Sequence, residues 1–129
     1  MALEIGIGDQ VIVPDCTFIG SANAVLMVGA DPIFVDVDRE QFLMDPDLVE
    51  AAITPRTRAI MPVHLFGGCA DMTRLKDIAE HHGLLIIEDA AQAVGVTWKG
   101  QPAGGLGNIG CFSFFADKTI TTGEGGFVC

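Results

Sequence analysis

The sequence predicts a three-layer α/β fold in which helices cover both faces of a mostly parallel sheet. Two observations support this prediction. Short apolar runs without polar alternation are typical of strands buried on both faces, and helical stretches lie between these runs. Such alternation of strand and helix favours a parallel sheet with right-handed crossovers. The 129 residues suffice for one domain with a hydrophobic core.

The predicted strands are short, apolar and bounded by glycine, proline or charged residues. In chain order they cover residues 11–13, 33–35, 59–61, 84–87 and 111–114, and a last strand begins at Gly126. The predicted helices cover residues 18–28, 47–53 and 72–82. Asp45 and Pro46 form a cap and first-turn signal for the second helix, and Gly83 ends the third.

The chain is strongly acidic, with a formal net charge of −10. This charge repels phosphate backbones, so we expect no binding to nucleic acid. No apolar run reaches the roughly 18 residues of a membrane helix. The N-terminus also lacks the pattern of a signal peptide, so we expect no membrane association. The 4 cysteines form no C-x-x-C pair, which favours a reducing, cytoplasmic setting.

Asp89 is the first candidate site residue. Ligands bind at the carboxyl ends of parallel strands, and Asp89 follows the run 84–87 and precedes small residues. A carboxylate in this place can hold the protonated ring nitrogen of a pyridine-type cofactor. The position also suits a helix N-cap, a role that aspartate performs well.

Lys118 is the second candidate. It follows the run 111–114 and precedes the glycine-rich segment 123–126. A lysine amine that is removed from water becomes a nucleophile. Because the chain has only 7 lysine and arginine residues, a cation beside a core segment is informative. The alternative is a surface lysine in a solvated hairpin.

Three further patterns have competing interpretations. Asp36 and Asp38 match the D-x-D pattern by which some glycosyltransferases hold a metal, and they also suit a solvated turn. Residues 105–110 fit G-x-G-x-x-G, but a strand follows where a dinucleotide site needs a helix, so we expect a flexible turn. His64 ends a strand and is either a site residue or a core histidine. The histidines and cysteines show no zinc spacing, so we expect no metal site.

Nearly the whole chain resembles the DegT/DnrJ/EryC1/StrS family of sugar aminotransferases. The matching segments, in the family's order and spacing, are VPDCTF (13–18), FVDVD (34–38), ITPRT (53–57), PVHLFG (62–67), EDAAQA (88–93) and FSF through GEGG (112–126). The resemblance implies the large domain of the fold type I enzymes that depend on pyridoxal 5′-phosphate (PLP), as in aspartate aminotransferase. In this family the D-x-D segment has no metal role.

The resemblance also implies catalytic roles for two residues. Lys118 resembles the lysine that forms a Schiff base with PLP and then moves the proton during the reaction. Asp89 resembles the partner of the cofactor's ring nitrogen. A positive ring nitrogen makes PLP an electron sink, and the lysine amine serves as nucleophile and base in turn.

Four other residues match cofactor-binding positions of the family. Phe18 matches the aromatic residue that stacks on the cofactor ring, and Thr17 is its neighbour. Gln92 matches a position beside the phenolic oxygen of the ring. Ser113 resembles a ligand of the phosphate.

Residues 1–129 are expected to form a partial PLP-binding large domain. We expect the family's N-terminal phosphate-binding segment and its C-terminal small domain to be absent from the chain. The first hypothesis is PLP-dependent transamination of a nucleotide-linked keto-sugar, with glutamate as amino donor, in a homo-oligomer. The second is a truncated, inactive fragment that acts at most as a self-association module. A third is a metal-dependent sugar-nucleotide transferase that uses Asp36 and Asp38.

Overall fold

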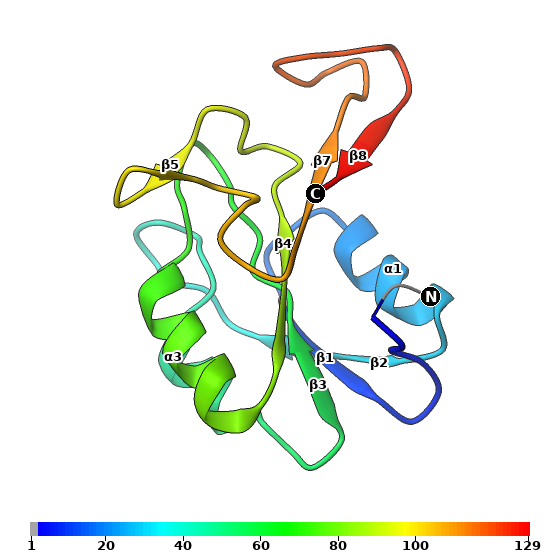
Figure 1. Cartoon of the computed structure of the whole chain (residues 1–129), viewed down its shortest axis with the longest axis vertical. Helices are drawn as coiled ribbons and strands as arrows, with labels where there is room; N and C mark the ends of the chain where they lie inside the picture. The colour runs from blue at the N-terminus through cyan, green and yellow to red at the C-terminus, as the bar shows by residue number, and fades with distance from the viewer. Residues whose placement is uncertain (1–2) are drawn as a thin grey trace.

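The computed structural model of the protein describes residues 3–129 and has three layers (Figure 1). Helix α1 covers one face of the central sheet, and α2 and α3 cover the other. The elements in chain order are β1 (Gln10–Pro14), α1 (Gly20–Met27), β2 (Asp31–Val35), α2 (Pro46–Ala51), β3 (Thr57–Ile60), α3 (Met72–His82), β4 (Leu85–Asp89), β5 (Thr97–Trp98), β6 (Gln101–Pro102), β7 (Ile109–Ser113) and β8 (Gly126–Val128). The predicted three-layer α/β fold is confirmed.

The central sheet has the strand order β2-β1-β3-β4-β7-β8. The strands from β2 to β7 pair in parallel, and β8 runs antiparallel to β7 at the edge. All the parallel strands therefore end at the same side of the sheet, where the segments that follow them come together. The strands β5 and β6 form a separate hairpin.

The helix ends follow from capping chemistry. The Asp45 carboxylate accepts a hydrogen bond from the Asp47 backbone N–H at the start of α2, and Asp71 caps α3 in the same way. Gly83 ends α3 with a φ of 65°, a left-handed conformation that suits glycine. Helix α1 begins two residues later than expected, at Gly20, and its N-cap makes no side-chain hydrogen bond.

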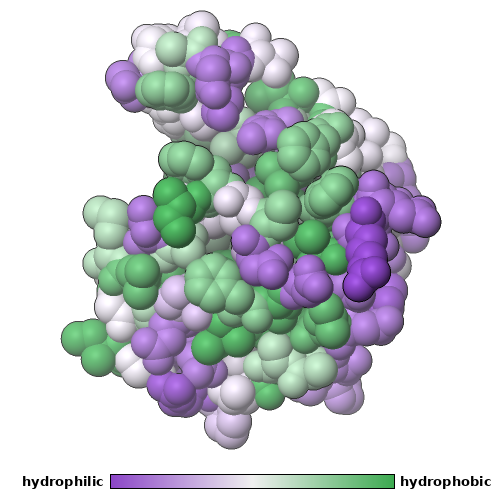
Figure 2. Space-filling model, turned by 180° about the vertical axis from the view of Figure 1, so that it is seen from behind, coloured by the Kyte–Doolittle hydropathy of each residue, from purple (hydrophilic) through white to green (hydrophobic). Residues whose placement is uncertain are grey.

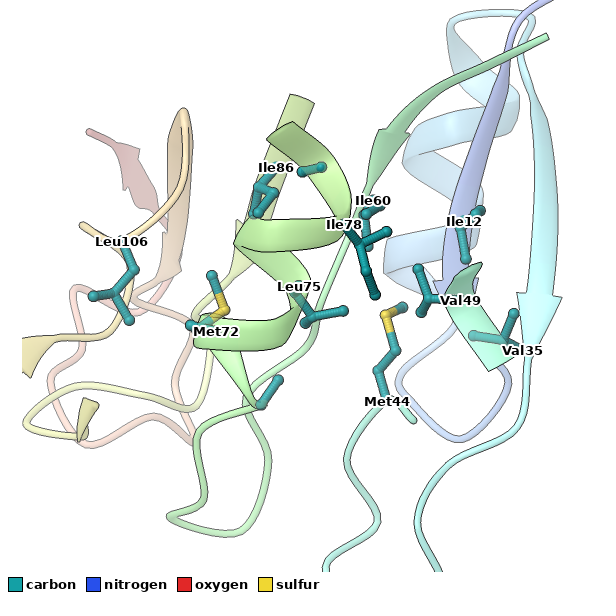
Figure 3. Close-up of a cluster of buried hydrophobic side chains, with 12 residues drawn as sticks. Ile12, Val35, Met44, Val49, Ile60, Met72, Leu75, Ile78, Ile86 and Leu106 are labelled. Carbon is teal, nitrogen blue, oxygen red and sulfur yellow. The ribbon is translucent and has the colours of Figure 1, made fainter. Parts of the chain in front are cut away.

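The core consists of buried clusters on the two faces of the sheet. The larger cluster joins α2 and α3 to the sheet and is shown in Figure 3; its members include Ile12, Val35, Val49, Ile60, Leu75 and Ile86. The smaller cluster packs Val25 of α1 against Val11, Val13 and Ala59. Adjacent residues of β1 thus serve opposite faces, as a strand covered on both sides requires.

Several expected boundaries are wrong, and one strand that was expected to be buried on both faces is an edge strand. Strand β4 continues to Asp89, so Asp89 ends the strand rather than following it. Strand β2 is at the edge of the sheet, and Phe34 on it is 54% exposed, so this strand is not buried on both faces. The β5–β6 hairpin was not expected, because two-residue strands are too short to show a pattern. It turns at Lys99 and Gly100, which both have positive φ.

Within residues 3–129, no helix combines the length and the apolar character needed to cross a lipid bilayer.

Candidate active site

A cavity of about 470 Å³ lies beyond the carboxyl ends of the strands. All six of the residues with an implied cofactor role contribute to its lining: Thr17, Phe18, Asp89, Gln92, Ser113 and Lys118. They come from segments far apart in the sequence, which the parallel sheet brings to one edge. Figure 2 shows a hollow between the lobe at the top of the molecule and its body. The volume of the cavity is in the range that small-molecule and cofactor sites occupy.

Asp89 is held at the end of β4 by both its backbone and its side chain. Its Oδ2 accepts a hydrogen bond of 2.7 Å from the hydroxyl of Ser21 on α1, and its Oδ1 accepts one from the Ala91 backbone N–H. The chain after Asp89 continues in turns and begins no helix before residue 97. The helix N-cap interpretation is therefore wrong, and the carboxylate faces the cavity.

Lys118 lies on the segment that connects β7 to β8. Its side chain is only 20% exposed, and its Nζ lies 3.2 Å from Oδ1 of Asp117. The backbone N–H of Lys118 donates to the Phe115 carbonyl, which closes a tight turn. This lysine is therefore not the solvated surface side chain of the alternative interpretation. Its amine borders the same cavity as Asp89.

The remaining lining residues offer an aromatic face and hydroxyl groups. Phe18 is 75% exposed, so its ring is free of protein contacts on much of its surface. The Thr17 hydroxyl is buried and has no hydrogen-bond partner within the described residues. The Ser113 hydroxyl accepts a hydrogen bond from the Phe115 backbone N–H and keeps its own proton available. A buried hydroxyl without a partner is costly unless a ligand or water satisfies it.

The charges around the cavity are mostly negative. Asp89, Asp117 and Glu124 are among its lining residues, and Lys118 is the only lining cation in the described part of the chain. Behind Asp89, burial raises the pKa of the Cys111 thiol, and the charges of Asp89 and Cys129 add to this effect. Together the lining offers an amine, a carboxylate, hydroxyls and an aromatic face. This set matches the carbonyl, ring nitrogen, phosphate and ring of PLP.

The structure also shows a buried carboxylate that the sequence did not single out. Glu88, next to Asp89, has no exposed surface and contacts the equally buried His64, with 3.0 Å between Oε2 and Nε2. Three backbone N–H groups, of Gly104, Leu106 and Gly107, also donate to its two oxygens. Burial alone raises the pKa of Glu88, but these four hydrogen bonds outweigh it, so the pKa lies below the usual value.

The residues of the other sequence patterns make hydrogen bonds within the fold and do not line the cavity. His64 is a core histidine with both ring nitrogens in hydrogen bonds. Residues 105–108 of the G-x-G-x-x-G segment form a loop whose start wraps the Glu88 carboxylate, but Ile109 and Gly110 already belong to β7, so the expected turn is too long. The Asp36 carboxylate accepts from the Val37 backbone, and that of Asp38 accepts from Glu40 and Gln41. Among residues 3–129, no three histidine, cysteine or acidic side chains are grouped to hold a metal ion.

Comparison with known protein families gives a match along the whole chain. The model of the DegT/DnrJ/EryC1/StrS aminotransferase family matches residues 1–129. The GDP-perosamine synthase of Caulobacter vibrioides is 54% identical over 128 residues, which is 99% of this chain and 34% of that protein. The UDP-N-acetyl-3-dehydro-alpha-D-glucosamine 3-aminotransferase of Acidithiobacillus ferrooxidans is 57% identical, over 98% of this chain and 35% of that protein. The chain therefore spans about a third of the length of these relatives.

Solved structures match the fold equally well. DesV of S. venezuelae, in complex with a ketimine intermediate, gives a TM-score of 0.94 at 49% identity, over 98% of this chain and 34% of that one. The PLP form of Spr1654 from Streptococcus pneumoniae gives a TM-score of 0.94 at 40% identity, over 98% of this chain and 36% of that one. The expected likeness to the large domain of fold type I PLP enzymes is confirmed.

Proposed function

Because the chain belongs to the DegT/DnrJ/EryC1/StrS aminotransferase family, we propose that it carries the PLP-binding lysine, Lys118, of a sugar aminotransferase. One observation supports this proposal above the others. The amine of Lys118 and the carboxylate of Asp89 border one cavity with an aromatic ring and hydroxyl groups, although Asp89 ends β4 and Lys118 lies on the segment between β7 and β8. The family's cofactor needs this combination of groups.

Each residue takes a role in the proposed site. Bound PLP supplies an electron sink that stabilises negative charge on the carbon next to the amino group. Lys118 would hold the cofactor covalently through Nζ, with the carbonyl oxygen of the cofactor leaving as water, and would afterwards accept and return a proton at the same atom. The Asp89 carboxylate would hold the ring nitrogen in its protonated form. The hydrogen bond from Ser21 fixes the direction of this carboxylate.

The other lining residues orient the cofactor. Phe18 offers the face of its ring, much of which is exposed toward the cavity. Gln92 would donate a hydrogen bond to the phenolic oxygen, and the Ser113 hydroxyl would hold the phosphate. The buried Thr17 hydroxyl, which has no partner among residues 3–129, would find its hydrogen-bond partner in the cofactor. The lining has too few cations to balance a phosphate, so backbone amides of the complete site supply the rest of this stabilisation.

For the reaction, we propose a nucleotide-linked keto-sugar as amino acceptor and glutamate as amino donor. Support for the acceptor comes from the relatives: one is named for GDP-perosamine and another for a UDP-linked 3-dehydro-glucosamine, whereas glutamate is implied only by the family resemblance. A third relative, from Streptomyces kanamyceticus, is named for L-glutamine and 2-deoxy-scyllo-inosose. Family membership therefore supports an amino transfer to a ring ketone more strongly than any single donor or acceptor.

A titration with PLP, followed by absorbance, tests the cofactor site. We expect the band of a covalently attached cofactor in the wild type and in Lys99→Ala, which removes an exposed lysine away from the cavity. The band should be lost in Lys118→Ala. An identical band in Lys118→Ala would contradict the proposal.

Exposed apolar side chains favour the self-association part of the second hypothesis, but they give no support to its inactivity. Ile7, Phe18, Met27 and Phe66 are each at least 75% exposed, and strands β2 and β8 leave the two edges of the sheet open. Large exposed apolar residues and open edges favour contact with another chain. We therefore propose a homo-oligomer. Light scattering of the purified protein tests this proposal, and a monomer at all concentrations would contradict it.

A further inference from the structure

The two walls of the cavity are joined behind it by the buried pair His64 and Glu88. Val63 and Leu65, on either side of His64, line the cavity, and so does Asp89, next to Glu88. Neighbouring side chains of an extended chain point to opposite sides. His64 and Glu88 therefore point away from the cavity, where both are fully buried and meet at 3.0 Å.

The hydrogen bonds define the state of the pair. Nδ1 of His64 accepts from the Ala70 backbone N–H, so its ring proton lies on Nε2 and is donated to Glu88 Oε2. Glu88 Oε2 also accepts from Gly104, and Oε1 accepts from Leu106 and Gly107. Each oxygen of the Glu88 carboxylate thus accepts two hydrogen bonds, and no N–H group faces another N–H group. This arrangement suits an ionised Glu88 beside a neutral histidine.

The backbone links the same two segments a second time. The His64 N–H donates to the Asp89 carbonyl at 3.0 Å, and the Asp89 N–H donates to the Pro62 carbonyl at 2.9 Å. Asp89 is therefore held between two backbone bonds on one side and its Ser21 and Ala91 bonds on the other. A change in the His64–Glu88 pair would therefore act on the backbone from which the Asp89 side chain projects.

From this geometry we infer that His64 and Glu88 are positioning residues that set the place of the Asp89 carboxylate in the cavity. The inference rests on the proposed function, in which Asp89 holds the ring nitrogen of PLP. Neither side chain touches the cavity, so the pair acts only through Asp89 and its neighbours. If this buried hydrogen bond served only stability, its loss would not change how the Asp89 carboxylate acts on a ligand.

The glycine-rich segment 104–107, whose backbone N–H groups donate to Glu88, is packed too closely to adopt another conformation easily. A Cβ on Gly104 would clash with Cζ of Phe112, and one on Gly107 would lie 2.9 Å from the Ile86 carbonyl oxygen. These close approaches let the backbone N–H groups reach Glu88. They also fasten the pair to β7, whose last residue, Ser113, lines the cavity.

Two substitutions of His64 separate positioning from general stability. His64→Leu removes the donor to Glu88, whereas His64→Gln keeps an N–H donor of similar reach. His81→Leu, on an exposed position of α3, is the matched control. The dissociation constant of PLP is measured for each variant at a temperature at which circular dichroism shows it to be folded. A double-mutant cycle combines His64→Leu with Asp89→Asn.

We expect His64→Leu to weaken PLP binding about tenfold, the scale at which loss of a supporting hydrogen bond acts on a bound group. His64→Gln should restore most of the affinity, and His81→Leu should not change it. In the Asp89→Asn background, His64→Leu should have little further effect. Equal PLP affinity in the wild type and His64→Leu, or fully additive effects in the cycle, would overturn the inference.

Amide hydrogen exchange gives a second test that needs no cofactor. The Ala91 N–H, which is bonded to the Asp89 carboxylate, should exchange faster in His64→Leu than in the wild type, while the Ile12 N–H of the central strand β1 changes less. His64→Gln should restore slow exchange at Ala91. Unchanged exchange at Ala91 would overturn the inference. Failure of the wild type to bind PLP would instead overturn the proposed function, and the exchange data would still decide the role of the pair.

Discussion

The hydroxyl of Ser21 on α1 donates a 2.7 Å hydrogen bond to Oδ2 of Asp89 at the end of β4, across 68 positions of sequence. Ser21 itself is buried, with 4% of its surface exposed, so water does not replace this bond readily. The bond fixes one lone-pair direction of the carboxylate and leaves the rest of it toward the cavity. Helix α1 thereby takes part in the site although, of these two residues, only Asp89 borders the cavity.

Ser21→Ala should therefore weaken PLP binding and lower the free energy of unfolding by about 1 kcal/mol, the usual scale for one hydrogen bond. The control is Thr73→Ala, which removes the acceptor of the Trp98 Nε1–H far from the cavity. Thr73→Ala should cost similar stability and leave PLP affinity unchanged. Denaturant unfolding and a PLP titration measure the two quantities. Equal PLP affinities for Ser21→Ala and the wild type would show that the bond does not act on the site.

Glu88 should make stability depend on pH in the acid range. Its pKa is lower in the folded state than in the unfolded chain, because the bonds from His64 and three backbone N–H groups outweigh burial. Its contribution is therefore complete above the unfolded pKa and is lost as the pH falls through the folded pKa. Glu88→Gln should cost roughly 1–3 kcal/mol at neutral pH, because its amide NH2 would face buried N–H donors, and it should flatten the acid limb of the stability curve. Urea unfolding between neutral and acid pH measures this; an unchanged acid limb would contradict it.

Cys69 should be the slow thiol of the protein. Burial, and then the charge of Glu88, raise its pKa to about 11, whereas Cys16 is exposed. Because the thiolate is the reactive form, alkylation at pH 8 should modify Cys16 well before Cys69. The unfolded chain loses this proton near 9.0, so the Cys69 contribution to stability should fall as the pH rises from about 9 to about 11. Mass spectrometry of each labelled cysteine measures the order of alkylation. Modification of Cys69 as early as Cys16 would contradict the prediction.

Gly107 should tolerate no side chain. A Cβ there would lie 2.7 Å from Cγ2 of Ile86 and 2.9 Å from its carbonyl oxygen, so β4 or the turn must move. We expect Gly107→Ala to destabilise the protein by roughly 1–3 kcal/mol, the cost of overpacking. Gly105→Ala is the matched control, because its nearest contact would be at an ordinary 3.6 Å. Thermal unfolding compares the two variants, and equal midpoints would contradict the close approach.

The layers and the main strands could be predicted from the sequence because local runs and caps determine them. Asp45, Pro46 and Gly83 mark helix ends through contacts within a few residues. The environment of Glu88 could not be predicted in this way. Its partners lie 24 residues earlier, at His64, and 16 to 19 residues later, at the glycine turn. A glutamate within an apolar strand does signal a buried partner, but the identity of that partner depends on the fold.

The candidate site shows the same division. Position alone left Asp89 open between a site carboxylate and a helix cap, and left Lys118 open between a nucleophile and a surface lysine. The structure excludes the helix cap and the solvated lysine, because both side chains lie at one cavity, and the roles of Asp89 and Lys118 in a cofactor site stay predictions. Ser21 was missed because a serine in the first turns of a helix is common. Only its distance to Asp89 distinguishes it.

The central claim is that Lys118 carries the cofactor, and covalent trapping tests it most directly. The protein is incubated with PLP, reduced with borohydride, digested and examined by mass spectrometry, with Lys118→Ala and Lys99→Ala treated in parallel. We predict a single pyridoxyl-modified peptide that contains Lys118 in the wild type and in Lys99→Ala, and no modified peptide in Lys118→Ala. An unmodified Lys118, or equal labelling of exposed lysines such as Lys99, would contradict the account.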